Sequence, residues 1–493
     1  MKPVTTWLRA RGVKVVAYLD DFFICDDSRD GVVKGISMLR EILEFLGFVV
    51  NELKSVEVPV QVLDFLGFSI NSITMSLSLP SKKRLMIVNA CERLLKAPKT
   101  TVRELASLLG LLSWASTAVE FAQSHYRHLQ RQYNAGLGES GGNMSAGVFL
   151  SDDSKKDLVW WFGSLPFLGG RSLVEESPAL VIFSDASLSG WGAACGDKTA
   201  SGPWTSVQLK RHINELELLG AFYSLHCFAE SLQGCSVLLK LDNTTAISYV
   251  NKLGGTKSPA LCELALTISE WCESRRIRLK ATHLPGIFNN VADQESRRKP
   301  DWSDWRLSPE LFELILGRWE VRVDLFASSW NAQLPRFASW TPQPGGWRVN
   351  ALSFSWENLN AYAFPPFSLI KNCLSKIVRE MSSLVLVCPF WPSQTWFPLL
   401  LELACAVPML FRQEPNQLLS CLGEPHPLCR TGALQLSAWM LSGRGSETRE
   451  FRSSPQNSSW HQLALRVSPL TKGPGGLGVA GVYDSVTIPC LII

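Results

Sequence analysis

Four acidic residues and one histidine in the middle of the chain are spaced as the parts of one site could be. Asp185 and Asp242 end two predicted strands, Glu217 lies on a predicted helix, and Asp293 begins another helix. Carboxylates from separate elements repel one another unless cations bind between them. In nucleic-acid enzymes, such clusters usually bind divalent ions that also contact a phosphodiester. His283, ahead of Asp293 and followed by a Leu-Pro-Gly loop, is placed to move a proton. The pattern predicts cleavage of nucleic acid.

The segment from 179 to 299 must position these residues. Strand-like runs (VIFSDAS, WGAAC and one near PWTSV) precede the helix INELELLGAFYSLHCFAESL. A strand, VLLKLDN, is followed by two helices, the strand RLKATHLP and a last helix that begins at NNVADQESR. The order βββαβααβα predicts a mixed sheet with helices packed against it.

This segment resembles the ribonuclease H family, which carries an Asp on the first strand, a Glu on the first helix and an Asp after the fourth strand. The family ends in His-x5-Asn-x3-Asp, and His283, Asn289 and Asp293 fit that ending. The resemblance implies hydrolysis of RNA in an RNA–DNA hybrid by two Mg²⁺ ions, for which Mn²⁺ can substitute. It assigns metal binding to Asp185, Glu217, Asp242 and Asp293, assistance in turnover to His283, and nucleic-acid contacts to Asn243 and Asn289.

Two alternatives bear on this assignment. Glu215 could replace Glu217 as the helix ligand, but residues two apart do not share a helical face. Glu217 is preferred because LLGA follows it in the manner of the family. Transposases and integrases share the fold but end in a catalytic Glu and lack the histidine loop, so the order Asp, Glu, Asp, Asp with His283 favours the hydrolase.

Near the N-terminus, Tyr18-Leu19-Asp20-Asp21 lies between two apolar runs and resembles the polymerase hairpin of reverse transcriptases. An amphipathic helix, GFVVNELKS and FLGFSI follow in the order of the later palm motifs. By this resemblance Asp20 and Asp21 bind metal, Lys54 lies near the nucleotide phosphate, and FLGFSI grips the primer.

The helical segment after FLGFSI is predicted to form a thumb and connection. Its first turn offers Lys82, Lys83 and Arg84 to a phosphate backbone. Reverse transcriptases need one more Asp from an earlier strand, yet residues 1–17 contain no Asp or Glu. The polymerase site is therefore predicted to be incomplete, without DNA synthesis by this chain alone.

A Trp- and Pro-rich stretch follows a linker at 297–305. Together with the preceding regions, VDLFASSWNAQLPRFASW and LVLVCPFWPSQTWFPLL resemble the segment after ribonuclease H in DIRS-type retrotransposons. That segment is similar to adenine methyltransferases, whose tetrapeptide Asp/Asn-Pro-Pro-Tyr/Phe reads Phe364-Pro365-Pro366-Phe367 here. Because Phe364 replaces the polar residue and no glycine-rich turn stands near Asp324, a degenerate domain is predicted. Its Trp residues could stack on bases, but core packing is the commoner role.

The bulk composition bounds the remaining choices. With 493 residues, 46% hydrophobic and 19% charged, the chain is predicted to fold as two to four domains. A net charge of +4 neither requires nor excludes nucleic acid. The 13 cysteines form no CxxC pair, and no signal-peptide core is present, which predicts a nuclear or cytoplasmic protein. The nearly uncharged stretch 384–411 is predicted to be a buried strand, loop and helix rather than a membrane span.

The predicted fold class is multidomain, α/β and α+β. The predicted domains are a partial palm at 1–80, a helical thumb and connection at 81–170, a ribonuclease H-like domain at 178–300, a smaller methyltransferase-like unit at 309–411 and a largely disordered tail at 412–493. The function predicted is that of a retrotransposon-derived endonuclease. The alternatives are a non-catalytic nucleic-acid-binding relic and a pseudogene product without a cellular role.

Overall fold

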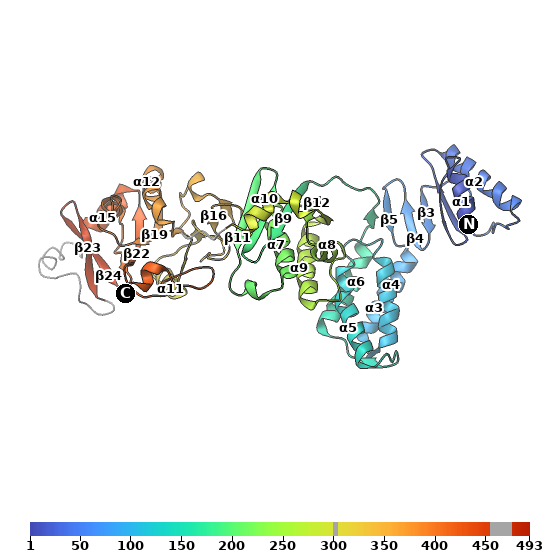
Figure 1. The fold of residues 1–493 in the computed structure, drawn as a ribbon, viewed down its shortest axis with the longest axis horizontal. Coiled ribbons are helices and arrows are strands. Elements are labelled where there is room, and N and C mark those ends of the chain that lie inside the picture. The colour runs from blue at the N-terminus through green and yellow to red at the C-terminus, as the bar shows by residue number, and fades with distance from the viewer. Residues whose placement is uncertain (299–303, 454–475) are drawn as a thin grey trace. The chain divides into compact units, whose positions relative to one another are not determined.

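The computed structural model describes residues 1–298, 304–453 and 476–493. The chain divides into an N-terminal unit, Met1–Ser177, and a C-terminal unit, Pro178–Ile493 (Figure 1). Each unit buries hydrophobic cores of its own. The mixed α/β multidomain class predicted from the sequence is therefore correct.

The N-terminal unit begins with a hairpin covered by two helices on one face. Val15 pairs with Ile24 across the hairpin and packs into a core with Leu8 and Leu43. The tight turn holds Leu19 at φ +52°. The stretch GFVVNELKS forms no strand: Val50 packs against this core, but Val49 is 97% exposed. The elements are α1 (Lys2–Arg9), β1 (Lys14–Tyr18), β2 (Asp21–Cys25) and α2 (Arg29–Phe45).

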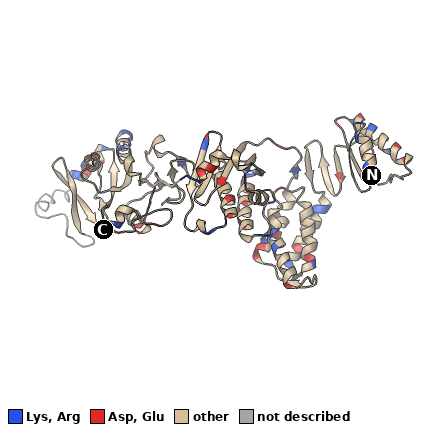
Figure 2. Ribbon diagram, in the orientation of Figure 1, with Lys and Arg blue, Asp and Glu red and all other residues tan. Residues whose placement is uncertain are grey.

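The rest of this unit is a small sheet, in the order β3-β4-β5-β8, and a helical bundle. Apolar side chains such as Leu105, Leu158 and Trp161 fill the bundle core. Charges of both signs are spread over these helices (Figure 2). The elements are β3 (Val62–Phe65), β4 (Phe68–Asn71), β5 (Ser76–Ser78), α3 (Ser81–Lys96), β6 (Thr100–Thr101), α4 (Val102–Ala115), α5 (Arg127–Glu139), β7 (Gly147–Val148), α6 (Asp152–Ser164) and β8 (Arg171–Ser172).

The C-terminal unit begins with a five-stranded region, residues 178–298, whose element order is the predicted βββαβααβα. Its sheet runs β11-β10-β9-β12-β13, with β9, β12 and β13 parallel and β10 and β11 antiparallel. The elements are β9 (Leu180–Ala186), β10 (Gly190–Cys195), β11 (Lys198–Pro203), α7 (Ile213–Phe228), β12 (Ser236–Leu241), α8 (Thr244–Asn251), α9 (Pro259–Arg275), β13 (Arg278–His283) and α10 (Asn290–Ser296).

A seven-stranded region, made by the described residues from 304 onward, follows in the order β15-β18-β19-β22-β20-β24-β23. Its strands are β15 (Val323–Asp324), β18 (Ala361–Ala363), β19 (Ser383–Pro389), β20 (Met409–Leu410), β22 (Leu436–Ser442), β23 (Leu477–Tyr483) and β24 (Val486–Ile492). Outside this sheet, the described residues form two short strand pairs and five α-helices: β14 (Arg306–Leu307), β16 (Ala338–Ser339), β17 (Arg348–Val349), β21 (Leu418–Leu419), α11 (Pro309–Leu316), α12 (Ile370–Glu380), α13 (Phe397–Leu403), α14 (Pro427–Arg430) and α15 (Gly445–Ser453).

The predicted disordered tail is wrong for the described part of 412–493. Strand β22 is almost wholly buried between β19 and β20, and β24 also pairs with β20. Their apolar sequences, LSAWMLS and VTIPCLI, are short buried strands whose partners lie far away in the sequence. The unit predicted at 309–411 therefore continues to the end of the chain and is not small. Residues 454–475 lie outside the described part.

The apolar stretch 384–411 folds as predicted. Strand β19 is buried, a loop follows, and α13 spans only Phe397–Leu403. Within the described ranges, no helix combines the length and apolar character needed to cross a bilayer.

Candidate metal centre

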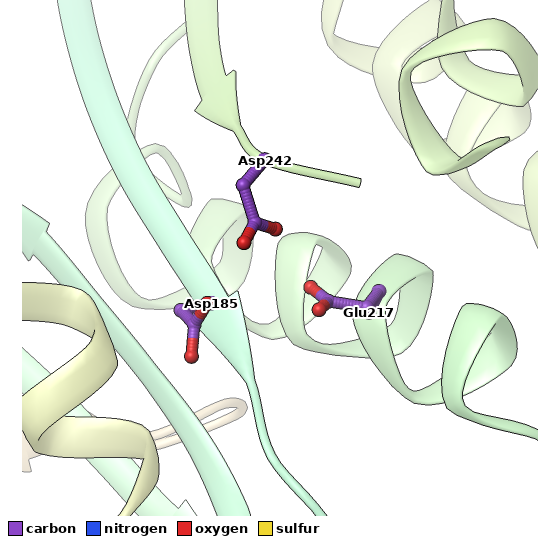
Figure 3. A group of neighbouring side chains, drawn as sticks. All are labelled: Asp185, Glu217 and Asp242. Atoms are coloured by element: carbon purple, nitrogen blue, oxygen red, sulfur yellow. The ribbon is translucent and has the colours of Figure 1, made fainter. Parts of the chain in front are cut away.

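Three of the four predicted acids converge at one end of the five-stranded sheet. Asp185 lies near the end of β9, Asp242 directly follows the parallel strand β12, and Glu217 lies on α7. One carboxylate oxygen from each lies within 4.8 Å of the others, and their side chains point toward one another (Figure 3). Among the described residues this is the one group of three or more His, Cys, Asp or Glu side chains placed to hold a metal ion. We call these residues the acid triad.

Burial makes the acid triad costly without a cation. Asp185 and Glu217 are each only 6% exposed. Desolvation, with the charges of Asp185 and Asp242 adding to it, raises the pKa of Glu217 to about 9. Desolvation also raises the pKa of Asp185, which a hydrogen bond from Ser296 opposes. Glu217 Oε2 is buried without a hydrogen-bond partner. Hard oxygen donors with an orphaned carboxylate oxygen fit a divalent cation such as Mg²⁺.

The structure distinguishes the two candidate glutamates on α7. Glu217 belongs to the acid triad, whereas Glu215 lies 4.0 Å from the guanidinium of Arg211 and is not part of the group. Residues two apart point about 200° apart around a helix, so only one of them can face the strand ends. The preference for Glu217 agrees with this geometry.

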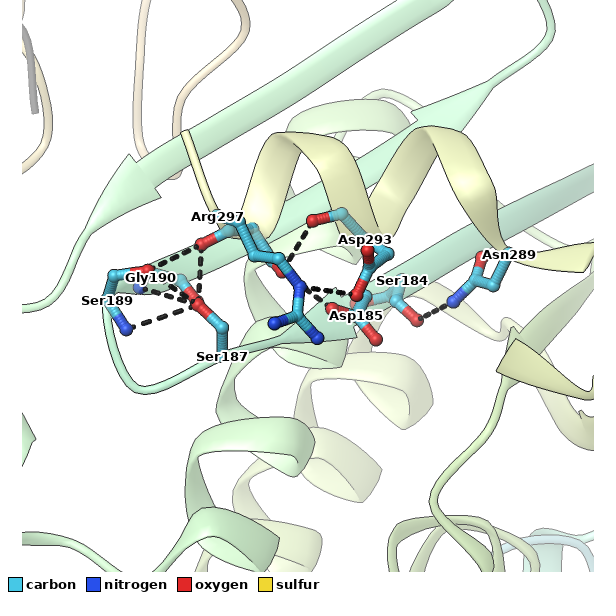
Figure 4. A network of polar contacts seen from close by, with 9 residues as sticks. Ser184, Asp185, Ser187, Ser189, Gly190, Asn289, Asp293 and Arg297 are labelled. Carbon is cyan, nitrogen blue, oxygen red and sulfur yellow. Dashed lines mark hydrogen bonds and ion pairs between the residues drawn. The ribbon is translucent and has the colours of Figure 1, made fainter. Parts of the chain in front are cut away.

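Asp293, the fourth predicted acid, does not join the group. Its Oδ1 lies 2.7 Å from Nε of Arg297, one helical turn further along the chain (Figure 4). It is nevertheless close enough for its charge to raise the pKa of Asp185. The prediction of one four-acid cluster is thus replaced by a triad and a neighbouring acid paired with arginine.

His283 lies next to Asp242 across the sheet. It ends β13 and pairs in register with Leu241, the residue before Asp242. The side chain is exposed, as are most residues of the following loop. A Cβ at Gly286 in that loop would lie 3.5 Å from Asp242 Oδ2. The loop therefore lies against Asp242, and the exposed His283 is one register position away on the neighbouring strand.

Asn289 was predicted to contact nucleic acid, and the structure contradicts this. Its side chain is 2% exposed and its Nδ2 donates to the main-chain oxygen of Ser184, 3.1 Å away. A buried amide cannot reach a nucleic acid, so Asn289 instead holds the start of α10 against β9. Asn243 is half-buried and caps α8 by accepting from the Ala246 amide, while its contact with nucleic acid stays a prediction.

Ser296 belongs to the site although no motif in the sequence marks it. Its Oγ lies 2.6 Å from Asp185 Oδ2, and both residues are buried. The available signal was weak: a small polar residue three positions after Asp293, on the same face of a short helix.

The other predicted acidic site, Asp20 and Asp21, differs from the acid triad in its exposure and in its number of converging ligands. Asp20 and Asp21 are exposed in the hairpin turn, and no described residue completes a three-ligand group with them. Lys54 is exposed in the loop after α2 and Lys82 is exposed at the start of α3. Lys83 lies over the Trp114 ring, and Arg84 donates to the main-chain oxygen of Leu79.

The predicted methyltransferase-like motif is packed into aromatic side chains. Phe364 follows β18, its ring lies 6.3 Å from that of Phe367, and Phe367 contacts Trp391. Asp324 is buried, and its carboxylate accepts hydrogen bonds from the main-chain amides of Phe326 and Gln333. Desolvation raises its pKa to about 7. These contacts give both features a structural role.

The Trp residues of this region differ in burial, and Trp330, Trp347 and Trp391 are half-buried. Trp356 and Trp396 are buried, whereas Trp340 is 66% exposed. Core packing, the commoner role, therefore applies to Trp356 and Trp396 and not to Trp340.

No protein-family model and no curated protein matches the chain. Among solved structures, foamy viral protease-reverse transcriptase in complex with RNA/DNA hybrid matches 62% of this chain and 41% of its own, with 19% identity and a TM-score of 0.32. LC11-RNase H1 in complex with RNA/DNA hybrid matches 24% of this chain and 92% of its own, with 20% identity and a TM-score of 0.20.

RNase H1 from Halobacterium salinarum matches 24% of this chain and 92% of its own, with 18% identity and a TM-score of 0.19. The chain spans about half the length of the foamy viral structures.

Proposed function

We propose that the five-stranded region hydrolyses the RNA strand of RNA–DNA hybrids with two divalent metal ions, Mg²⁺ or in its place Mn²⁺. The observation that carries the proposal is the convergence of Asp185, Glu217 and Asp242 from three separate elements. Their partial burial makes the group unfavourable unless a cation binds. Bound ions would supply a polarised water and stabilise the leaving oxygen of an in-line displacement.

The chain's own residues contribute position and proton transfer. The acid triad would hold the cations between β9, α7 and β12. His283, exposed beside Asp242, would move a proton at the open side of the site and help product leave. Asp293 would approach the cations once its pair with Arg297 opens.

The choice of substrate rests on the resemblance to ribonuclease H. The βββαβααβα order and the His-x5-Asn-x3-Asp ending both accord with it. The position of His283 beside Asp242 favours this family over transposases and integrases, which lack the histidine loop.

We further propose that the chain derives from a retroelement, with a DIRS-like origin as the specific hypothesis. Residues 1–80 and 81–170 would descend from a reverse transcriptase palm and from its thumb and connection. The ribonuclease H-like domain would span 178–300, and the region from 309 onward would be a methyltransferase-like remnant. We also propose that the protein acts inside the cell, in the nucleus or the cytoplasm.

A second candidate is a non-catalytic nucleic-acid-binding relic. The observation that favours it is the ion pair that keeps Asp293 apart from the acid triad. Both candidates bind hybrid, but only the enzyme cuts it.

A cleavage assay separates the two candidates. A labelled RNA–DNA hybrid is incubated with the full chain and Mg²⁺, beside Asp242→Asn and Asp20→Asn variants. The proposal predicts cleavage by the wild type and by Asp20→Asn, and none by Asp242→Asn. If the folded wild type binds the hybrid without cutting it, only the non-catalytic nucleic-acid-binding relic remains as a candidate.

A further inference from the structure

The last turn of α10 places one buried hydroxyl against the acid triad. Ser296 Oγ lies 2.6 Å from Asp185 Oδ2 and 2.9 Å from the main-chain oxygen of Asp293. Ser296 is 0% exposed and Asp185 is 6% exposed, so no bulk water competes for this contact. A hydroxyl has one hydrogen for two acceptors, and a carboxylate attracts it more strongly than a neutral carbonyl does.

Neighbouring residues fix where Ser296 lies. A Cβ at Gly192 of β10 would lie 2.3 Å from the Ser296 nitrogen, so only glycine lets α10 approach the strand this closely. The main-chain oxygen of Ser296 accepts hydrogen bonds from the hydroxyls of Ser187, at 2.7 Å, and Ser189, at 3.3 Å. Figure 4 shows this network running from the β9–β10 turn to Asp185. The hydroxyl therefore has a defined position.

We propose that Ser296 is a positioning residue for the metal ligand Asp185, an inference that rests on the proposed metal-dependent function. Its hydroxyl occupies Oδ2 and fixes the rotation of the carboxylate. The other oxygen, Oδ1, then faces the cation. Groups that orient a metal ligand from behind contribute substantially to affinity, and their loss commonly weakens metal binding by about 10- to 100-fold.

The simpler alternative is that the Ser296 hydroxyl only satisfies its own hydrogen-bonding capacity within α10. A helical serine often donates to the carbonyl three residues back, and Asp293 offers that acceptor. In that case removal of the hydroxyl would affect the packing of α10 but not the affinity for metal. The two roles therefore differ in a measurement of metal binding.

Mn²⁺ titration by calorimetry on the full chain provides the test, with a thermal melt to verify folding. Ser296→Ala is predicted to weaken Mn²⁺ binding by about tenfold. The matched control is Ser224→Ala, which removes another buried helical hydroxyl that donates to the carbonyl three residues back and has no hydrogen bond to the acid triad, and it is predicted to change the affinity less than about twofold. Unchanged affinity in Ser296→Ala, or equal weakening in both variants, would overturn the inference.

Two further measurements keep the outcome decisive. If Ser296→Ala does not fold, Ser296→Cys keeps the volume with a weaker donor and should bind Mn²⁺ with intermediate affinity. Wild-type affinity in that variant would contradict the role. A wild type that binds Mn²⁺ but cuts no hybrid would reject the proposed function and leave the positioning role intact. Hybrid cleavage by wild type with unchanged Mn²⁺ affinity in Ser296→Ala would support the proposed function and reject the positioning role.

Discussion

The chain carries two acidic sites, of which the sequence already predicts one to be incomplete, and the structure separates them further by burial and convergence. In the hairpin, Asp20 and Asp21 are exposed to water, where like charges are screened and cost little. In the acid triad, two of three carboxylates are buried, and the pKa of Glu217 is raised to about 9. A cation gains most where the protein has already desolvated its ligands in a fixed geometry. The comparison teaches that spacing in the sequence finds acids, whereas burial and convergence decide which acids form a site.

The largest expected effect is the difference between removing one acid of the acid triad and removing one acid of the hairpin. Asp185→Asn or Asp242→Asn should lower hybrid cleavage by about a thousandfold or more, because each removes a metal ligand from a preorganised site. Asp20→Asn and Asp21→Asn should leave the rate unchanged. Rates measured at saturating Mg²⁺ check this, and a comparable loss in the hairpin variants would erase the distinction between the sites.

A second expected result concerns the hairpin itself. The isolated chain should not extend a primer on an RNA template, because no described residue completes a three-ligand group with Asp20 and Asp21. Extension with Mg²⁺ and all four nucleotides is measured beside a functional reverse transcriptase. Synthesis by the wild type that disappears in Asp21→Asn would show that exposure does not disqualify a site.

The stability of the metal-free protein should depend on Glu217 in a definite direction. Its pKa is raised from 4.5 to about 9, so the fold favours the protonated acid. The stabilisation from protonation is complete below pH 4.5 and is lost as pH rises through about 9. Glu217→Gln should therefore raise the melting temperature of the metal-free protein by a few degrees near pH 8 while abolishing cleavage.

Thermal melts across this pH window, with and without Mg²⁺, measure the effect. Glu215→Gln, on the same helix but outside the acid triad, is the matched control and should change neither stability nor cleavage by much. If Glu217→Gln instead melts lower than wild type at pH 8, the buried acid is stabilised by contacts that the structure does not show.

The smallest effect concerns Asp293. Arg297→Gln should lower the Mg²⁺ concentration for half-maximal cleavage by about two- to threefold, because an exposed ion pair within one helix is weak. Arg298→Gln, which disrupts the neighbouring pair with Glu295, is the control and should have no effect. A higher Mg²⁺ requirement in Arg297→Gln would mean that the arginine helps the site rather than competing for Asp293.

Much of the site could be predicted because its parts are local. The strand and helix patterns around Asp185, Glu217 and Asp242 gave the correct element order, and parallel strands bring their ends together. The pair of Asp293 with Arg297 has an i,i+4 signal in the sequence, although the family pattern assigns Asp293 to the metal instead. The burial of Asn289 was not predictable, because it depends on how closely α10 approaches the sheet. That distance is set by Gly192, a residue with no motif around it.

The error in the last region has a related cause. The segment after 412 lacks helical periodicity, and its buried strands β22 and β24 find partners far away in the sequence. Short apolar runs of this kind read as strands only when the neighbouring strand is known.

Cleavage of RNA at the acid triad is tested most directly by identifying which strand of a hybrid is cut and which ends the products carry. Hybrids labelled on either strand are treated with the full chain and Mg²⁺, and the products are resolved beside synthetic markers. We expect cuts confined to the RNA strand that leave 3′-hydroxyl ends, and we expect these cuts to disappear in Asp185→Asn. Cuts in the DNA strand, or cuts that persist in Asp185→Asn, would contradict cleavage of RNA at the acid triad.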